Sequence, residues 1–168
     1  MRFSEDLTAR ARIRDAAVRR FGLDGFAGTP IKRIAADARV SAGLVVHHFG
    51  SKQGLIEACD AYAIAFAEVA EQRTEGNHEV LAYLARAMVE RSADTAPLFD
   101  QMVARSEQAL AESEARDTTD PKQRAAVLVA MELGGYALRA HLGRYFGEAD
   151  FEHIGRAMSE ILTKGLYS

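Results

Sequence analysis

The sequence is poor in the features that mark secreted, disulfide-bonded or membrane-spanning proteins. It contains a single cysteine, Cys59, so a framework of intrachain disulfides is excluded. No apolar run approaches the ~18 residues that a membrane-spanning helix needs. The first residues lack the apolar segment of a signal peptide. Tryptophan is absent and there are only 3 prolines. These features predict a cytoplasmic protein without a membrane partner.

Apolar residues recur at helical spacing along the chain. Hydrophobic residues make up 48% and charged residues 27% of the 168 positions, as in an ordinary globular protein. The alternation that marks β-strands is absent, so the periodicity predicts an all-α fold. The expected helices cover residues 7–24, 30–38, 42–49, 52–73, 78–93, 97–110, 121–146 and 150–166, with a polar stretch over 112–122.

Residues 29–55 carry the pattern of two short helices joined by a tight turn and followed by the start of a third. Thr29, placed before a proline, is a suitable N-terminal cap for the first helix. Arg39 and Val40 form the expected turn, and Ser41 and Ser51 are the expected caps of the next two helices. Apolar residues occupy the positions where the short helices face each other. The pattern predicts a DNA-binding helix-turn-helix.

The basic residues are concentrated in the first third of the chain. Residues 1–55 carry ten Lys or Arg against five Asp or Glu, a balance of +5, whereas residues 56–168 have a balance of −8. Double-stranded DNA would be attracted to the N-terminal part alone, although arginines scattered on solvated helix faces are the alternative. We therefore expect a DNA-binding domain over residues 1–52 and a second helical domain over 53–168.

A larger set of positions extends the helix-turn-helix pattern. The set comprises Ile13, Ala16, Ala17, Phe21, Gly25, Phe26, Thr29, Ile34, Ala35, Ala38, Val40, Ser41, Gly43, His48, Phe49, Ser51, Lys52 and Leu55. In order and spacing these residues resemble the DNA-binding domain of the TetR/AcrR family of bacterial transcriptional regulators. The resemblance implies a homodimer on operator DNA, with a variable C-terminal region that forms a ligand pocket and the dimer interface.

The resemblance and the helix positions together give a set of predicted DNA contacts. The set comprises Thr29, Ala42, Gly43, Leu44, His47, His48 and Lys52. His47 is the preferred candidate for a base edge. Lys52 opens a helix whose N-terminus favours a phosphate, with a merely solvated lysine as the alternative. Thr29 either only caps its helix or also touches a phosphate.

Three further positions near the predicted recognition helix need separate interpretation. Gly43 either lets the helix backbone approach DNA closely or permits a close contact with another helix. His47 and His48 do not predict a metal site, because neighbours on a helix point about 100° apart. Val46 stands where the resembled family usually has a phosphate-binding Tyr, and Val cannot make that hydrogen bond.

The C-terminal part carries a candidate ligand pocket but no catalytic constellation. The residues that would line an apolar cavity are Tyr62, Phe66, Tyr83, Met88, Phe99, Met102, Val103 and Tyr136. A filled core is the alternative, and periodicity does not separate the two. Cys59 lies on an apolar stripe, where a buried and inert thiol is the ordinary outcome. We therefore expect neither a cofactor nor a metal, and the effector would be an unknown small molecule.

Two late helices carry more apolar residues than one protomer needs for its core. The candidate dimer interface comprises Leu128, Met131, Gly135, Leu138, Leu142, Phe146, Ile154, Met158, Ile161 and Leu162. These residues recur every three or four positions, which predicts a four-helix interface around a two-fold axis.

Three functions from different classes are consistent with the sequence. The preferred one is a homodimeric repressor that a small apolar ligand releases from its operator. The second is a DNA-binding protein of the same fold that acts structurally or through a protein partner, which a filled C-terminal core would favour. The third, a small helical enzyme using Cys59 or a histidine, would need a polar cleft with perturbed titratable groups. We therefore expect a regulator and not an enzyme.

Overall fold

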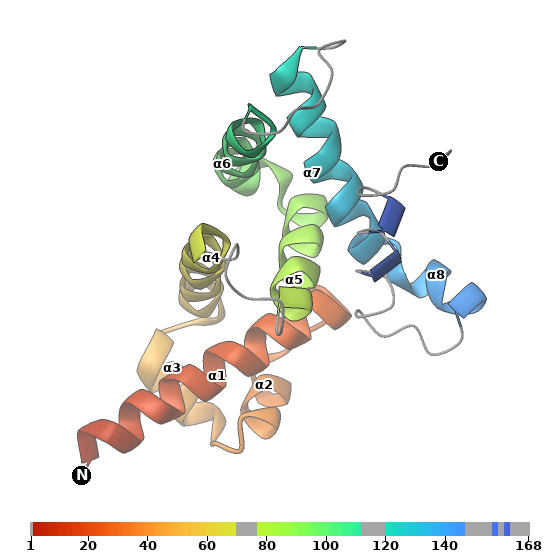
Figure 1. The fold of residues 1–168 in the computed structure, drawn as a ribbon. Coiled ribbons are helices and arrows are strands. Elements are labelled where there is room, and N and C mark those ends of the chain that lie inside the picture. Colours follow the sequence, from red (N-terminus) through yellow and green to blue (C-terminus); the bar gives the residue numbers. More distant parts are fainter. Residues whose placement is uncertain (1, 70–76, 112–119, 147–155, 158–159, 162–168) are drawn as a thin grey trace. The chain divides into compact units, whose positions relative to one another are not determined.

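The computed structural model of the chain describes residues 2–69, 77–111, 120–146, 156–157 and 160–161. These residues form helices α1 (Arg2–Asp24), α2 (Ile31–Asp37), α3 (Ala42–Phe49), α4 (Lys52–Val69), α5 (Asn77–Glu90), α6 (Ser92–Ala111), α7 (Pro121–Ala137) and α8 (Arg139–Phe146). The described ranges contain no strand (Figure 1), and the predicted all-α fold is confirmed. The chain divides into two compact units, residues 1–84 and 85–168, with the boundary inside α5.

The first unit is built around α1, which contacts α2, α3 and α4. Phe21 of α1 stacks on Phe26 with ring centroids 4.9 Å apart, and the Tyr83 ring of α5 meets Phe26 edge-on at 5.4 Å. The Tyr83 hydroxyl donates a 2.6 Å hydrogen bond to Asp60 of α4. Gly22 allows α5 to approach, because a Cβ there would lie 2.9 Å from the backbone nitrogen of Tyr83. This aromatic cluster therefore fixes the frame that carries α2 and α3.

Helix boundaries in the first unit follow local hydrogen bonds, and one predicted cap is wrong. The Ser41 hydroxyl accepts from the Leu44 N–H at 3.1 Å, and the Ser51 hydroxyl accepts from a backbone N–H one turn into α4 at 3.0 Å, as expected. The Thr29 hydroxyl instead donates to the Gly25 carbonyl at 2.7 Å. The N-cap of α2 is Pro30, which has no capping side chain.

The second unit places α6 against α7, and α8 follows α7 after a break. The prediction of one unbroken helix over 121–146 is therefore wrong. The N–H groups of His141 and Leu142 both bond the Leu138 carbonyl, at 2.9 and 3.1 Å, so a new helical turn starts there. The break follows one turn after Gly134 and Gly135, whose low helix propensity weakens this segment.

Other predicted bounds differ from the structure for local reasons. Helix α6 begins at Ser92 rather than near 97, because the Arg91 carbonyl accepts from the N–H groups of Asp94 and Thr95 at 3.0 and 3.1 Å. Pro97 consequently lies inside α6. Most of the predicted helix over 150–166, and most of the polar stretch over 112–122, fall outside the described residues.

Candidate nucleic-acid interface

One face of α3 is open to solvent in the first unit. Gly43, Val46 and His47 are exposed and lie at i, i+3 and i+4 spacing, so they share a face of the helix. Val45 on the opposite side is fully buried. This division gives α3 an anchored side and a free side, as a recognition helix requires.

The remaining predicted contacts on α3 lie at the edges of that face. Ala42, Leu44 and His48 are half-buried, so each presents less of its side chain to solvent than His47 does. The predicted residues of α3 therefore lie together on one helix, but they differ in how far their side chains are exposed to solvent. Val46, which the sequence analysis treated as a lost contact, is more exposed than Leu44 or His48.

The structure also separates the two interpretations of Gly43. A Cβ built on Gly43 would meet only the Ser41 hydroxyl oxygen, at 3.8 Å, within a 4 Å radius. Within the described ranges, no other helix approaches closely enough there to require glycine. The close helix–helix contact is therefore not supported among the described residues, and a close approach to DNA stays a prediction.

The turn before α3 carries a basic residue in an unusual conformation. Arg39 has a φ of 55°, in the left-handed region that favours glycine. Its N–H bonds the Ala36 carbonyl at 3.1 Å, and the next N–H, from Val40, bonds the Ala35 carbonyl at 2.9 Å. The turn therefore closes α2 tightly and leaves the Arg39 side chain exposed. Residue spacing predicts Arg39 only as a turn residue and gives no sign that its charge is exposed.

Several other basic residues of this unit are already paired. Arg20 forms a two-point contact with Asp37 and reaches Asp24 at 3.3 Å, while Arg33 lies 3.5 Å from Asp24. The hydrogen bond from Arg20 holds the pKa of Asp37 below its ordinary value of 3.8. These arginines link α1 to α2 and are less available to DNA. Lys32 is exposed and, within the described part of the chain, makes no ion pair.

The two predicted phosphate contacts outside α3 have structural roles. The Thr29 side chain is 0% exposed and its hydroxyl is bonded to Gly25, so its predicted contact with a phosphate is corrected. The Lys52 ammonium donates to the Phe26 carbonyl at 2.5 Å and lies 6.0 Å from the Phe21 ring centre. Lys52 therefore ties the start of α4 to the aromatic cluster, whether or not it also reaches DNA.

A groove of about 420 Å³ runs beside α1 and α4 in the first unit. The Arg14 guanidinium lies 3.8 Å from the centre of the Tyr62 ring, and Arg10 lies 5.4 Å from that of Phe49. Tyr62, predicted for the ligand pocket, thus lines this groove instead. Arg14 also pairs with Asp15 at 2.6 Å, which uses part of its hydrogen-bonding capacity.

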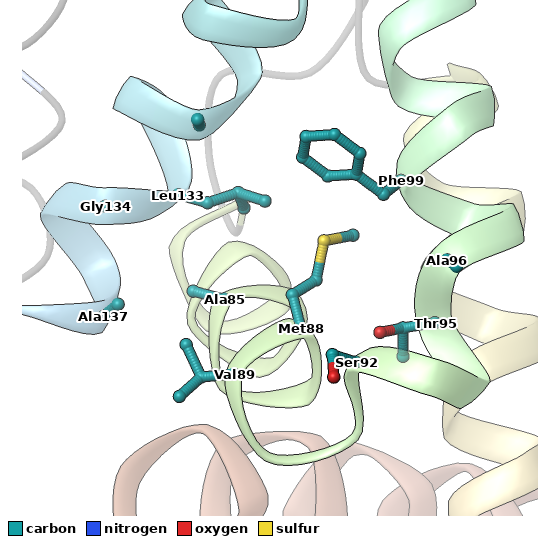
Figure 2. A pocket seen from close by; sticks show the side chains of 11 residues that line it. Ala85, Met88, Val89, Ser92, Thr95, Ala96, Phe99, Leu133, Gly134 and Ala137 are labelled. Carbon is teal, nitrogen blue, oxygen red and sulfur yellow. The ribbon is translucent and has the colours of Figure 1, made fainter.

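The second unit contains a separate apolar cavity of about 400 Å³. Met88 of α5, Phe99 of α6 and Leu133 of α7 point toward one another across it (Figure 2). Of the lining residues that the structure describes, Ser92 and Thr95 alone carry a side-chain oxygen, and the Thr95 hydroxyl donates to a backbone carbonyl at 3.0 Å. Among the described residues, no ionisable side chain lines this cavity.

The predicted pocket residues are distributed over both units. Met88 and Phe99 line the apolar cavity. Tyr83 is buried in the core of the first unit, so its predicted place in the pocket is corrected. The others lie elsewhere: Phe66 is half-buried beside Tyr62, Met102 is half-buried on α6, and Val103 and Tyr136 are buried.

Of the predicted dimer residues that can be described, Leu128, Met131 and Gly135 lie on α7, and Leu138 directly follows its last residue. Met131 is 46% exposed, Leu138 is 57% exposed, and Val127 of α7 is 58% exposed. Leu128, Gly135 and Leu142 are half-buried, and Ile161 is exposed. The side chains of Phe146, Ile154, Met158 and Leu162 lie outside the described residues. The prediction of a dimer interface remains untested.

A short capped helix with a free face, held on a three-helix frame, defines a helix-turn-helix DNA-binding regulator. Comparison with known proteins gives the family. Residues 13–59 match the family model for bacterial regulatory proteins of the tetR family, and residues 75–166 match that for the tetracyclin repressor-like C-terminal domain. The chain therefore belongs to the TetR family of transcriptional regulators, which are DNA-binding proteins and not enzymes.

Relatives in sequence agree with this assignment. The HTH-type transcriptional regulatory protein RaaS of Mycobacterium tuberculosis (strain ATCC 25618 / H37Rv) is 37% identical over 157 residues, covering 80% of this chain and 73% of RaaS. The regulator BetI of Burkholderia thailandensis is 43% identical over 49 residues, covering 29% of this chain and 25% of BetI. Similarity to BetI is thus confined to a short segment.

Solved structures share the fold. A TetR-family transcriptional regulator from Rhodococcus sp. superposes with a TM-score of 0.60 at 19% identity, covering 95% of this chain and 99% of that one. A structure described as the molecular basis for control of antibiotic production by a bacterial hormone gives a TM-score of 0.55 at 22% identity, covering 93% and 96% of the two chains. In the parts of the chain that are described, no helix is long and apolar enough to cross a membrane.

Proposed function

We propose that the protein is a homodimeric cytoplasmic repressor that leaves its operator when a small, uncharged, apolar molecule binds in the second unit. In this proposal, DNA binding belongs to residues 1–52, which lie within the first compact unit. The observation that carries this part is the free face of α3, formed by Gly43, Val46 and His47. The observation that carries the ligand response is the apolar cavity of about 400 Å³.

In the proposed complex, α3 enters the major groove and the exposed basic residues beside it meet phosphates. Lys32 on α2 and Arg39 in the turn are exposed, whereas Arg20 and Arg33 are engaged with carboxylates. Replacing Lys32 or Arg39 by alanine should weaken binding to all duplexes alike and lower the salt slope by about 0.9 for each lost contact. His47→Ala should instead relax sequence preference. Unchanged salt slopes and unchanged preference would contradict this docking.

The lining of the cavity determines the class of ligand that we propose. An ionised group placed there would lose its hydration without gaining an opposite charge, which is strongly unfavourable. Apolar surface on Met88, Phe99 and Leu133 would instead favour a hydrocarbon or aromatic body. The volume of about 400 Å³ lies within the range of small-molecule pockets, toward its lower end. The open cavity also favours this function over a purely structural one.

A matched pair of fluorophores tests the cavity directly. N-phenyl-1-naphthylamine is uncharged, and 1-anilinonaphthalene-8-sulfonate carries the same rings with an added sulfonate. We expect the first to bind and the second to bind much more weakly. Gly134→Leu should abolish binding of the first, because Gly134 lines the cavity and a Cβ there meets nothing within 4 Å. Gln123→Leu, on the exposed first turn of the same helix, is the control. Equal binding by all three proteins would contradict the assignment.

Coupling between the cavity and DNA is tested by measuring both equilibria. A ligand that weakens operator binding tenfold must itself bind tenfold more weakly to the operator complex, which is about 1.4 kcal/mol of coupling. Uncharged apolar compounds are titrated into the free protein and into the complex. A compound that Gly134→Leu excludes but that binds equally with and without DNA would contradict release by ligand.

The proposed dimer uses an apolar stripe that follows α7 and ends at Leu138, directly after the helix. Val127, Met131 and Leu138 are exposed in the single chain at spacings of four and seven residues, so they can meet a symmetry-related copy. Met131→Lys should shift sedimentation from dimer to monomer because it places a charge in an apolar contact. Gln101→Lys adds the same charge at an exposed position of α6, away from the stripe, and should leave the dimer intact. A monomer in the unmodified protein at micromolar concentration would contradict the proposal.

A further inference from the structure

We infer that Val46 selects a thymine in the operator through contact with the 5-methyl group of that base. This inference rests on the proposed function, because it takes α3 as the helix that enters the major groove. Val46 is 45% exposed. Among side chains described in the first unit, residues 8–66 and 78–84, it is the only large apolar one exposed to that degree.

The position of Val46 on α3 explains why its side chain is available. Val45 takes the buried position in the core, and Val46 follows about 100° around the helix beside His47. The neighbour one turn earlier is Gly43, which has no side chain to shield it. Val46 therefore stands on the open face next to the least bulky position of the helix.

The chemistry of Val46 limits what it can recognise. Its side chain has neither a donor nor an acceptor, so it can form no hydrogen bond with a phosphate or with a polar base edge. In the major groove, thymine alone presents a C5-methyl group: cytosine has only a hydrogen at C5, and adenine and guanine present mainly hydrogen-bonding groups. An isopropyl group on the groove-facing side of α3 is thus complementary to thymine. Contact between the two would remove both apolar surfaces from water.

The test compares thymine with uracil, which differs by that methyl group alone. Duplexes bound by the unmodified protein are first selected from a random pool. Each thymine of the selected site is then replaced in turn by uracil, and the affinity is measured by fluorescence anisotropy. We expect one uracil-sensitive position in each half-site, with a loss of about 4-fold, which corresponds to ~0.8 kcal/mol for one buried methyl group.

Two variants assign that loss to Val46. In Val46→Ala, thymine and uracil at the sensitive position should be bound equally, while uracil at other positions acts as the internal control. Val46→Ile keeps the branched apolar side chain and should preserve the preference. Both residues tolerate helical structure, so the variants are expected to fold.

The outcomes separate this inference from the proposed function. If the uracil effect persists unchanged in Val46→Ala, or if no position is sensitive while His47→Ala still alters sequence preference, α3 docks but Val46 does not read thymine. A selected half-site without thymine would overturn the inference in the same way. If neither Val46→Ala nor His47→Ala changes affinity or preference, the proposed docking of α3 itself fails.

Discussion

Replacing Gly43 by alanine should raise the thermal stability of the protein and at the same time lower its affinity for operator DNA. Gly43 lies in the first turn of α3, and a Cβ there would lie 3.8 Å from the Ser41 hydroxyl oxygen. The added methyl group therefore causes no clash in the free protein. Alanine also restricts the unfolded chain and favours helix, which is worth ~0.5–1 kcal/mol. For a chain of this size, we expect the melting temperature to rise by up to about 2–4 °C.

The same variant should bind DNA less well. If glycine is present because the α3 backbone approaches DNA closely, the Cβ of alanine must push the helix outward. A displacement that removes even one good base contact costs ~1–3 kcal/mol. We therefore expect a loss of operator affinity of about tenfold, measured by anisotropy with duplexes selected by the unmodified protein.

A second glycine provides the matched control. A Cβ on Gly54, in the first turn of α4, would lie 2.1 Å from the Phe49 carbonyl oxygen, so the backbone must shift. Gly54→Ala should therefore lower the melting temperature, whereas Gly43→Ala should raise it. If Gly43→Ala destabilises the fold, the space around Gly43 is not open as described. If it stabilises the fold and binds the operator normally, close approach to DNA is not the reason for glycine.

Three further predictions concern residues that hold the first unit together. Arg39→Gly should stabilise the protein by up to ~1 kcal/mol in urea denaturation, because glycine adopts a φ of 55° without strain, whereas Arg39→Val should destabilise it. Asp37→Asn should lower stability at neutral pH, but the difference should vanish in acid: the pKa of Asp37 is lowered when folded, so its contribution is complete above about 3.8 and is lost as pH falls below that value. Burial raises the pKa of the Cys59 thiol from 9.0 to about 12, so alkylation of the native protein by iodoacetamide at pH 8 should be far slower than alkylation in urea. Because only the unfolded thiol ionises between those two values, stability should also fall as pH rises above 9, and Cys59→Ala should remove that part of the decline.

Sequence patterns located the helix-turn-helix because its signals are local. A serine before a helix can satisfy the first free N–H groups, and Ser41 does so. Thr29 precedes a helix in the same way, but its hydroxyl turns back to the Gly25 carbonyl. Gly25, with a φ of 80°, folds the chain back after α1 and places that carbonyl within reach. The hydrogen-bond acceptor of Thr29 is therefore set by the path of the chain, and residue spacing does not predict it.

Apolar periodicity could not distinguish cavity walls from filled core. Tyr83 and Phe99 both occur at helical spacing among apolar residues, yet Tyr83 packs against Phe26 and Phe99 lines the open cavity. Periodicity also continued through Leu138, so the break between α7 and α8 was missed. The exposure of Val46 was not predicted. Its neighbour Val45 is the same amino acid, and the two differ only in the side of the helix on which they lie.

Because helix α5 belongs to both units, it limits where the chain can be divided when one unit is exchanged for that of another regulator. The boundary between the units falls after Leu84, in the interior of this helix rather than in a linker. Its first half supplies Tyr83 to the aromatic cluster, and its second half supplies Met88 to the cavity wall. Cutting at the boundary would leave residues 77–84 of the helix on one fragment and residues 85–90 on the other, about two turns each, too short to persist without their packing partners. A chimaera that exchanges operator specificity between regulators of this fold should therefore carry α5 intact, with its crossover placed before Asn77 or after Glu90 and the contacts at the retained end rebuilt.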